Sequence, residues 1–163
     1  GTTGLQTEQL EKLDALAEHA PVLWSPHMSL GVLVLRQLVE RAATLLPDFD
    51  VEVVEAHHHL KVDAPSGTGL ALAKAAQRAR PGARITTGRS GNGARRSDEI
   101  GVQAIRGGSV VGDHTVYLLG AGERLALSHH AETRAQFARG AVAAAAWLHD
   151  KPPGRYALDE VLS

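Results

Sequence analysis

Apolar residues recur at helical spacing in the first part of the chain, and a short run at strand spacing follows them. Thr7 is predicted to cap a helix over residues 7–20, which Pro21 ends. The apolar positions of this helix are Leu10, Leu13, Leu16 and Ala17. Residues 21–24 then have the composition of a short buried strand. The order of turn, helix and strand indicates one repeat of a doubly wound sheet.

A second helix is predicted between Ser29, which is placed to cap it, and Pro47. Its apolar stripe is expected to bury one face of a sheet and comprises Leu30, Leu33, Val34, Leu38, Ala42 and Leu45. Residues 50–57 follow as a strand with alternating valines at its centre. After a polar turn, residues 66–68 begin an alanine- and leucine-rich helix. Because the first N–H groups of a helix carry partial positive charge, this helix start favours an anion such as a carboxylate or phosphate.

Glycine, serine and arginine dominate residues 85–101, which are predicted to form a mobile surface loop. Its arginines lie beside acidic residues, which favours a solvated loop over a phosphate or nucleic-acid site. The charged residues concerned are Arg89, Arg95, Arg96, Asp98 and Glu99.

Three strands joined by short turns are predicted over residues 102–128, so we expect an antiparallel or mixed sheet carrying helices. On the middle strand one face carries Val110, His114, Val116 and Leu118, and the other carries Val111, Asp113, Thr115 and Tyr117. An alanine-rich helix is predicted over residues 131–149 and a final half-helix in the tail from 154 to 163. Arg134 falls in the first turn of the alanine-rich helix, where a cation opposes the helix dipole, and this hints at an external anionic partner.

Composition bounds the class of protein. The 163 residues are enough for one ordinary domain or two small ones, and 44% hydrophobic residues support an aliphatic core. Seventeen Lys and Arg against eighteen Asp and Glu give a formal charge of -1, which argues against a nucleic-acid or membrane-surface partner. No apolar run reaches the length of a membrane span, and the lack of cysteine fits a cytoplasmic protein.

Titratable residues concentrate in one stretch, EAHHHLKVDAPSGTG, from Glu55 to residue 69. If the preceding strand continues through it, His57 and His59 share a face with Glu55 and His58 points away. A run of histidines at a strand end is often only solvated. Here histidine and lysine, two proton carriers, adjoin a helix start suited to an anion. We predict no metal site, because three adjacent histidines on an extended strand do not converge on one ion and cysteine is absent.

The same stretch closely resembles the signature of dihydrodipicolinate reductase (4-hydroxy-tetrahydrodipicolinate reductase), a nicotinamide-dependent enzyme family of lysine and diaminopimelate biosynthesis. The resemblance implies that His57 is the acid/base and Lys61 the proton donor. It further implies a set of residues that hold a cyclic dicarboxylate substrate, namely His58, Ser66, Gly67, Thr68 and Arg134.

The resemblance also implies NADPH or NADH as cofactor and two turns that contact it. The first is the Gly-Thr-Thr turn formed by Gly1, Thr2 and Thr3. The second comprises Ser25, Pro26, His27 and Met28, and the family usually has asparagine where this chain has His27. The residues that read the ribose 2′ position fall in a part of the family enzyme that precedes this sequence.

For domain organisation, the resemblance implies an α+β and α/β chain: a mixed sheet with helices on one face, flanked by remnants of a Rossmann-like dinucleotide-binding domain. Residues 1–27 and 139–163 are assigned to the remnants, and residues 28–138 to a substrate-binding and tetramerisation domain. We expect the chain to be a fragment of a homotetramer. Alone, its helices over 7–20 and 131–149 would expose apolar faces, so we expect poor solubility or association through the sheet of residues 102–128.

The implied reaction is reduction of 4-hydroxy-tetrahydrodipicolinate to tetrahydrodipicolinate by hydride from the nicotinamide. One alternative is a truncated, catalytically weak relative that serves as a dicarboxylate-binding or assembly module. A second alternative takes the Pro-Ser-Gly-Thr-Gly turn as a phosphate cradle. Against it, a P-loop ends in Gly-Lys-Ser/Thr, whereas Lys61 precedes the turn here.

Overall fold

The computed structural model describes residues 5–162, which belong to two compact units. One unit is discontinuous and combines the chain up to Leu33 with the chain from Thr133 onward. The other unit is Val34–Glu132. Within the described range, no helix combines the length and the apolar content that crossing a membrane requires.

The discontinuous unit pairs the two ends of the chain. Its elements are α1 (Thr7–Ala17), β1 (Pro21–Leu23), α4 (Ala135–Leu148), β7 (Gly154–Tyr156) and the 3₁₀ helix η1 (Leu158–Leu162). β1 and β7 run parallel, with Pro21 opposite Gly154. Its buried core comprises Met28, Leu33, Ala144 and Leu158. The predicted helix, strand and final half-helix are confirmed, whereas strand β7 was not predicted, because three residues carry too little pattern to distinguish a strand from a turn.

Both helix starts in this unit differ from the prediction. In α1 the cap residue is Gln6, not Thr7, and its backbone N–H donates to the Gln9 side chain at 2.8 Å. The helix also ends at Ala17, short of residue 20. α4 begins at Ala135, where the Thr133 hydroxyl accepts the Ala135 N–H at 2.9 Å. Arg134 is therefore the cap residue and lies outside the first turn.

Gly140 allows α4 to approach the backbone of Met28. A Cβ atom at this buried position would overlap the Met28 carbonyl oxygen. Gly140→Ala is expected to lower the free energy of unfolding by about 1–3 kcal/mol, because the obstructing atom is backbone and α4 must move away. The better helix propensity of alanine, about 1 kcal/mol, offsets only part of this loss. Urea denaturation measures the change.

Gly107→Ala is the matched control for Gly140→Ala, since a Cβ there would meet no atom within 4 Å. We expect the control to shift the unfolding midpoint little. Equal midpoints for the two variants would show that the approach of α4 to Met28 does not depend on a missing side chain.

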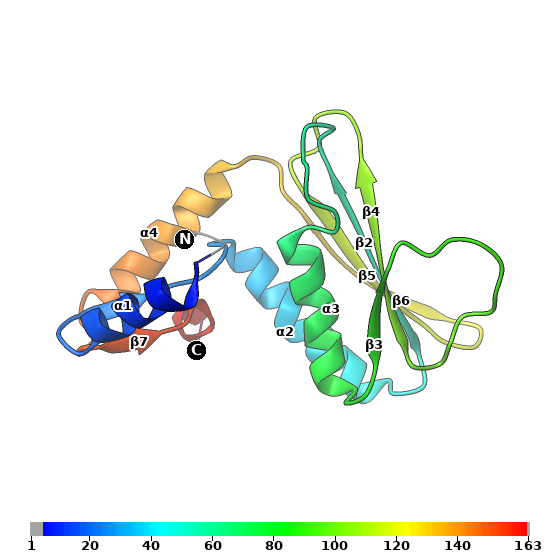
Figure 1. Ribbon diagram of the computed structural model, residues 1–163, viewed down its shortest axis with the longest axis horizontal. Coiled ribbons are helices and arrows are strands. Elements are labelled where there is room, and N and C mark those ends of the chain that lie inside the picture. The colour runs from blue at the N-terminus through cyan, green and yellow to red at the C-terminus, as the bar shows by residue number, and fades with distance from the viewer. Residues whose placement is uncertain (1–4, 163) are drawn as a thin grey trace. The chain divides into compact units, whose positions relative to one another are not determined.

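The continuous unit is built on a five-stranded sheet in the order β3-β4-β2-β5-β6 among the described residues. The strands are β2 (Asp50–His57), β3 (Arg84–Thr87), β4 (Glu99–Arg106), β5 (Asp113–Leu119) and β6 (Arg124–His130). β2 runs parallel to β4 and antiparallel to β5. Helices α2 (Leu30–Leu45) and α3 (Gly67–Ala79) lie on the same side of this sheet (Figure 1). The predicted mixed sheet with helices on one face is confirmed.

The core of this unit forms where alternate strand residues meet the two helices. The fully buried set includes Val51, Val53, Val116 and Leu118 from the strands and Val39 and Leu72 from the helices. The predicted burying stripe of α2 is correct only in part. Leu33 is buried and Ala42 packs against the core, but Val34, Leu38 and Leu45 are 42–59% exposed. The other buried side chains of the helix are Val32, Leu35, Val39 and Ala43. α2 is apolar on more than one side, so helical spacing alone fits two different stripes.

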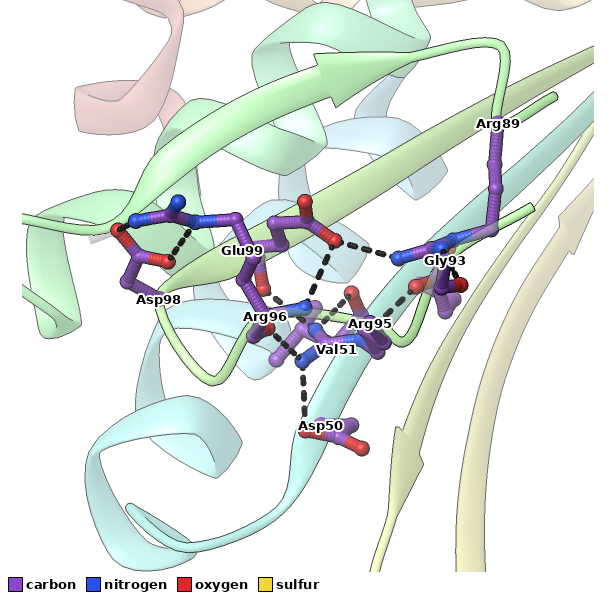
Figure 2. A network of polar contacts seen from close by, with 9 residues as sticks. Asp50, Val51, Arg89, Gly93, Arg95, Arg96, Asp98 and Glu99 are labelled. Atoms are coloured by element: carbon purple, nitrogen blue, oxygen red, sulfur yellow. Dashed lines mark hydrogen bonds and ion pairs between the residues drawn. The ribbon is translucent and has the colours of Figure 1, made fainter. Parts of the chain in front are cut away.

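The predicted loop over residues 85–101 is partly strand. Residues 85–87 belong to β3, which pairs parallel with β4, and residues 99–101 belong to β4 itself. In the remaining loop the arginines are held by acidic side chains and carbonyl groups (Figure 2). Arg95 donates to Asp50 at 2.7 Å and to Glu52 at 3.2 Å, and Arg89 pairs with Glu99 at 2.6 Å. These contacts attach the loop to the starts of β2 and β4, and they account for its arginines without an external anion.

Candidate active site

The site forms at the end of β2, on the side of the sheet that faces the helices. Glu55 is 0% exposed and His57 follows it on the same face. The Nδ1 atom of His57 lies 2.5 Å from Oε2 of Glu55, so the ring donates its Nδ1 hydrogen to the carboxylate. The predicted sharing of a face by these two residues is confirmed.

Three further donors reach the Glu55 carboxylate. Arg106, at the end of β4, places Nη1 3.0 Å from Oε2 and Nη2 2.8 Å from Oε1. The backbone N–H of Ser66 donates to Oε1 at 3.0 Å. Burial alone raises the pKa of Glu55, but the hydrogen bonds from Arg106, Ser66 and His57 outweigh it and bring the pKa below its ordinary value. Glu55 is therefore a buried, ionised acceptor.

The ionised Glu55 carboxylate determines which nitrogen of the His57 ring carries the hydrogen. Since Nδ1 donates to an ionised carboxylate, the neutral ring carries its lone pair on Nε2. Nε2 lies against Gly112, where a Cβ atom would stand only 3.1 Å from it. Glycine thus leaves room beside the atom of His57 that is able to exchange a proton.

Ser66 joins this pair to the start of α3. Its hydroxyl caps the helix by accepting the Gly69 N–H at 3.1 Å, as predicted for the helix start. A Cβ on Gly69 would lie 3.2 Å from Glu55 Cγ, so the bare glycine lets the helix approach the carboxylate. Because the Ser66 N–H is used by Glu55, the first-turn N–H groups of Gly67 and Thr68 are the ones that suit an external anion.

His114, on β5, completes the buried cluster. Its ring stands edge-on to His57 with centroids 5.2 Å apart, and its Nε2 lies 3.3 Å from the Ser66 hydroxyl oxygen. Burial, helped by the neighbouring His57, lowers the pKa of His114 to about 4. His114 is therefore neutral at physiological pH.

Glu55, His57 and His114 each offer a ligand atom within 4.8 Å of one another, a spacing that also suits a metal ion. The contacts of the carboxylate oppose that use. Arg106 brings a positive charge to both carboxylate oxygens, and His57 already donates to one of them. A divalent cation would have to displace both donors, so we assign the cluster to hydrogen-bond and proton chemistry.

Lys61 lies in the turn after β2 and pairs with Asp63, with Nζ 2.6 Å from Oδ1. The hydrogen bond from Lys61 holds the pKa of Asp63 below its usual value. The Asp63 carbonyl also accepts from the Nη2 of Arg106. Arg106 thus connects the turn that carries Lys61 to the carboxylate that holds His57.

The other residues singled out in the sequence have different surroundings. His58 is partly buried just beyond β2, whereas His59 is exposed and its Nδ1 lies 2.9 Å from the Gly108 carbonyl oxygen. His59 was expected to share the Glu55 face only if the strand continued through it, and this condition is not met, because β2 ends at His57 and the chain turns. Arg134 is exposed in the discontinuous unit, which does not contain His57.

The residues expected to contact a cofactor lie in the discontinuous unit as well. Ser25 and Met28 are buried, Pro26 is exposed and His27 is partly buried. Gly1, Thr2 and Thr3 lie outside the described residues.

Arg106 and His114 were missed as site residues. Each left a weak signal: Arg106 ends an apolar strand just before two glycines, and His114 interrupts the apolar face of β5. Neither signal indicates that the two strands flank β2, which is what brings these side chains to Glu55 and Ser66.

Comparison with known families agrees with this geometry. The family model described as "Dihydrodipicolinate reductase, C-terminus" matches residues 31–162. The chain belongs to the dihydrodipicolinate reductase family. The resemblance seen in the histidine stretch is thereby confirmed, and the alignment extends it through both compact units.

Individual reductases match nearly the whole chain. The 4-hydroxy-tetrahydrodipicolinate reductase of Aquifex aeolicus is 50% identical over 99% of this chain and 62% of its own length. That of Methylocella silvestris is 52% identical over 99% of this chain and 61% of its own length. A solved dipicolinate-bound dihydrodipicolinate reductase from Paenisporosarcina sp. TG-14 superposes with a TM-score of 0.76 and 25% identity, covering 96% of this chain and 61% of that one. The chain thus spans a little under two thirds of the length of these relatives.

Proposed function

We propose that the protein carrying this chain reduces 4-hydroxy-tetrahydrodipicolinate to tetrahydrodipicolinate with NADPH or NADH, in lysine and diaminopimelate biosynthesis. The observation that carries the proposal is the buried Glu55–His57 pair beside the start of α3. The His57 ring, whose tautomer is fixed, lies beside a helix start that suits an anion. The chain is also 50% identical in sequence to an enzyme named for this reaction.

The roles proposed for the site residues combine the contacts at the start of α3 with the roles that the resemblance implies. The first-turn N–H groups of Gly67 and Thr68, with the Ser66 hydroxyl, bind one substrate carboxylate. Lys61, with His58 or, by the resemblance, Arg134, neutralises the remaining negative charge. His57 exchanges a proton through its Nε2 atom. The resemblance implies that Lys61 is the proton donor. The 4-hydroxyl group leaves as water, which produces a conjugated double bond. The substrate then gains one hydride and one proton across that bond.

The cofactor would supply the hydride from its reduced nicotinamide ring. The described residues fit its nicotinamide end by position, because residues 25–28 follow the carboxyl end of β1, where ligands of parallel αβ sheets bind. We assign Ser25, Pro26, His27 and Met28 to that contact, with the Gly-Thr-Thr turn at residues 1–3. We also propose that residues 1–27 and 139–163 complete a dinucleotide-binding domain and that residues 28–138 bind the substrate.

The alternative is a dicarboxylate-binding or assembly module without reductase activity. Isothermal calorimetry with pyridine-2,6-dicarboxylate and with NADPH, together with an assay of nicotinamide oxidation, separates the two. We expect the full-length protein to bind both ligands and to turn over. Binding of the dicarboxylate without NADPH affinity or turnover would favour the module. Inhibition by nucleotides instead of dicarboxylates would favour the phosphate-handling alternative.

We further propose that the protein is a homo-oligomer, a tetramer by the resemblance, associated through the sheet face that the helices leave open. Strand alternation places Val54, Ile105 and Tyr117 on that face, and Ile105 is 54% exposed. The same face also carries Glu52, Gln103 and Thr115, so the exposed Ile105 side chain is the feature that favours association. The cytoplasm remains the proposed compartment, supported by the absence of cysteine from the 163 residues.

Ile105→Glu is expected to shift the full-length protein toward monomer, because it replaces an exposed apolar side chain of the open sheet face by a charge. Multi-angle light scattering measures the mass. The control is Val142→Glu, which changes an apolar residue of α4 that is 70% exposed. A monodisperse monomer for the unmodified protein would contradict the proposal.

A further inference from the structure

The hydrogen-bond partners of His114 determine which ring nitrogen carries its hydrogen. Nε2 lies 3.3 Å from the Ser66 hydroxyl oxygen, while Nδ1 is buried and has no hydrogen-bond partner among residues 5–162. A neutral imidazole has one N–H donor and one lone pair. Placing the hydrogen on Nδ1 would bury an unpaired N–H, which folded proteins avoid more strictly than an unpaired acceptor. The hydrogen therefore belongs on Nε2, where it is donated to Ser66.

This tautomer determines the direction of the Ser66 hydroxyl. The oxygen then accepts two hydrogen bonds, from Gly69 N–H at 3.1 Å and from His114 Nε2–H at 3.3 Å. A hydroxyl has two lone pairs and one hydrogen, so both lone pairs are in use and only the hydrogen is left to bond. The structure shows no acceptor for that hydrogen within the described part of the chain, and Ser66 lies at the helix start assigned to an anion.

We propose that His114 is a positioning residue that holds Ser66 as a hydrogen-bond donor to the carboxylate of the bound ligand. The inference rests on the proposed function for the nature of the ligand. Without the His114 donor, the Ser66 hydroxyl is free to turn its hydrogen toward the interior and to present a lone pair to the ligand, which repels a carboxylate. Ser66 would then contribute little to anion binding although it still caps α3.

The tautomer is measured directly by long-range ¹H–¹⁵N NMR on the histidine-labelled full-length protein, with His114→Gln used to assign the signal. We expect the pattern of an Nε2–H ring for His114 at neutral pH, without ligand. An Nδ1–H pattern would overturn the inference. This reading does not depend on what the site binds.

The role in binding is measured with pyridine-2,6-dicarboxylate as the probe. His114→Leu is expected to raise its Kd about tenfold, and Ser66→Ala by a similar amount, as for a lost hydrogen bond to a charged group. Because the two act through one hydroxyl, we expect His114→Leu to add nothing in the Ser66→Ala background. Additive effects, or an unchanged Kd in His114→Leu, would overturn the inference.

His114→Gln provides the conservative test, since its amide N–H₂ reaches the place of Nε2 and offers the same donor. We expect it to restore most of the affinity that His114→Leu loses, and it keeps the test available if the leucine variant does not fold. Equal affinities for the glutamine and leucine variants would count against a donor role. If the unmodified protein does not bind the dicarboxylate, both the proposed function and the proposed role of Ser66 in ligand binding fail. The tautomer of His114 is still decided by NMR.

Discussion

Replacing His57 by glutamine in the full-length protein is expected to lower kcat about 10²- to 10⁴-fold, the usual contribution of a positioned acid or base. Glutamine keeps an N–H donor for Glu55 but has no nitrogen that exchanges a proton near neutral pH. We therefore expect the free energy of unfolding to stay within about 1 kcal/mol of the unmodified protein. Steady-state kinetics and urea denaturation on the same sample measure both quantities.

Lys61→Ala tests the same assignment from the other side of the site. We expect a loss of about 10²-fold or more in turnover, because a positive charge near the developing negative charge is removed. Its pair with Asp63 is at the surface, so the stability change should be below about 1 kcal/mol.

His59→Gln and Lys74→Ala are the matched controls for these two variants. His59 is exposed beyond the end of β2, and Lys74 is exposed on α3. Both controls should retain activity. If His57→Gln or Lys61→Ala turns over at close to the rate of the unmodified protein, the catalytic role assigned to that residue is wrong.

Glu55→Gln is expected to cost about 3 kcal/mol of unfolding free energy at neutral pH. The variant leaves the Arg106 guanidinium beside a neutral amide, and breaking a buried pair by removing one partner is strongly destabilising. Glu40→Gln is the control, because Glu40 pairs with Arg78 at the surface and its loss should cost less than about 1 kcal/mol.

The effect of Glu55 on stability also depends on pH. Its folded pKa is below the ordinary value of 4.5, so its stabilisation is complete above that pH and is lost as pH falls through the folded pKa. We therefore expect the difference between the unmodified protein and Glu55→Gln to shrink progressively below about pH 4.5. Urea midpoints measured across this range test the prediction. A difference that stays constant would mean that the Glu55 carboxylate is not ionised in the folded protein.

The spacing of residues along one strand or helix predicted the positions of those site residues that lie on the same element. The alternation of β2 placed Glu55 and His57 on one face, and Ser66 was placed correctly at the start of α3. The same rule did not apply to His59, because alternation does not say where a strand ends. For α2, helical spacing fitted more than one stripe, and only the packing on the sheet decided that Val39 is buried and Leu38 exposed.

The partners that come from other strands could not be predicted in this way. Arg106 is 51 residues from Glu55 in sequence and His114 is 48 residues from Ser66. Their contacts depend on β4 and β5 flanking β2, and the order of strands in a mixed sheet is not contained in the periodicity of any one strand.

The residues that donate hydrogen bonds to the Glu55 carboxylate lie 2, 11 and 51 residues away from it in the sequence. The shorter contacts close small loops, whereas the contact with Arg106 requires β4 to have docked in parallel beside β2. Closing such a loop carries an entropic cost that slows folding relative to local contacts. We therefore expect the full hydrogen-bond set of the site to form late in folding. A chain with β2 and α3 in place but β4 not yet docked would hold His57 beside Glu55 without the Arg106 guanidinium.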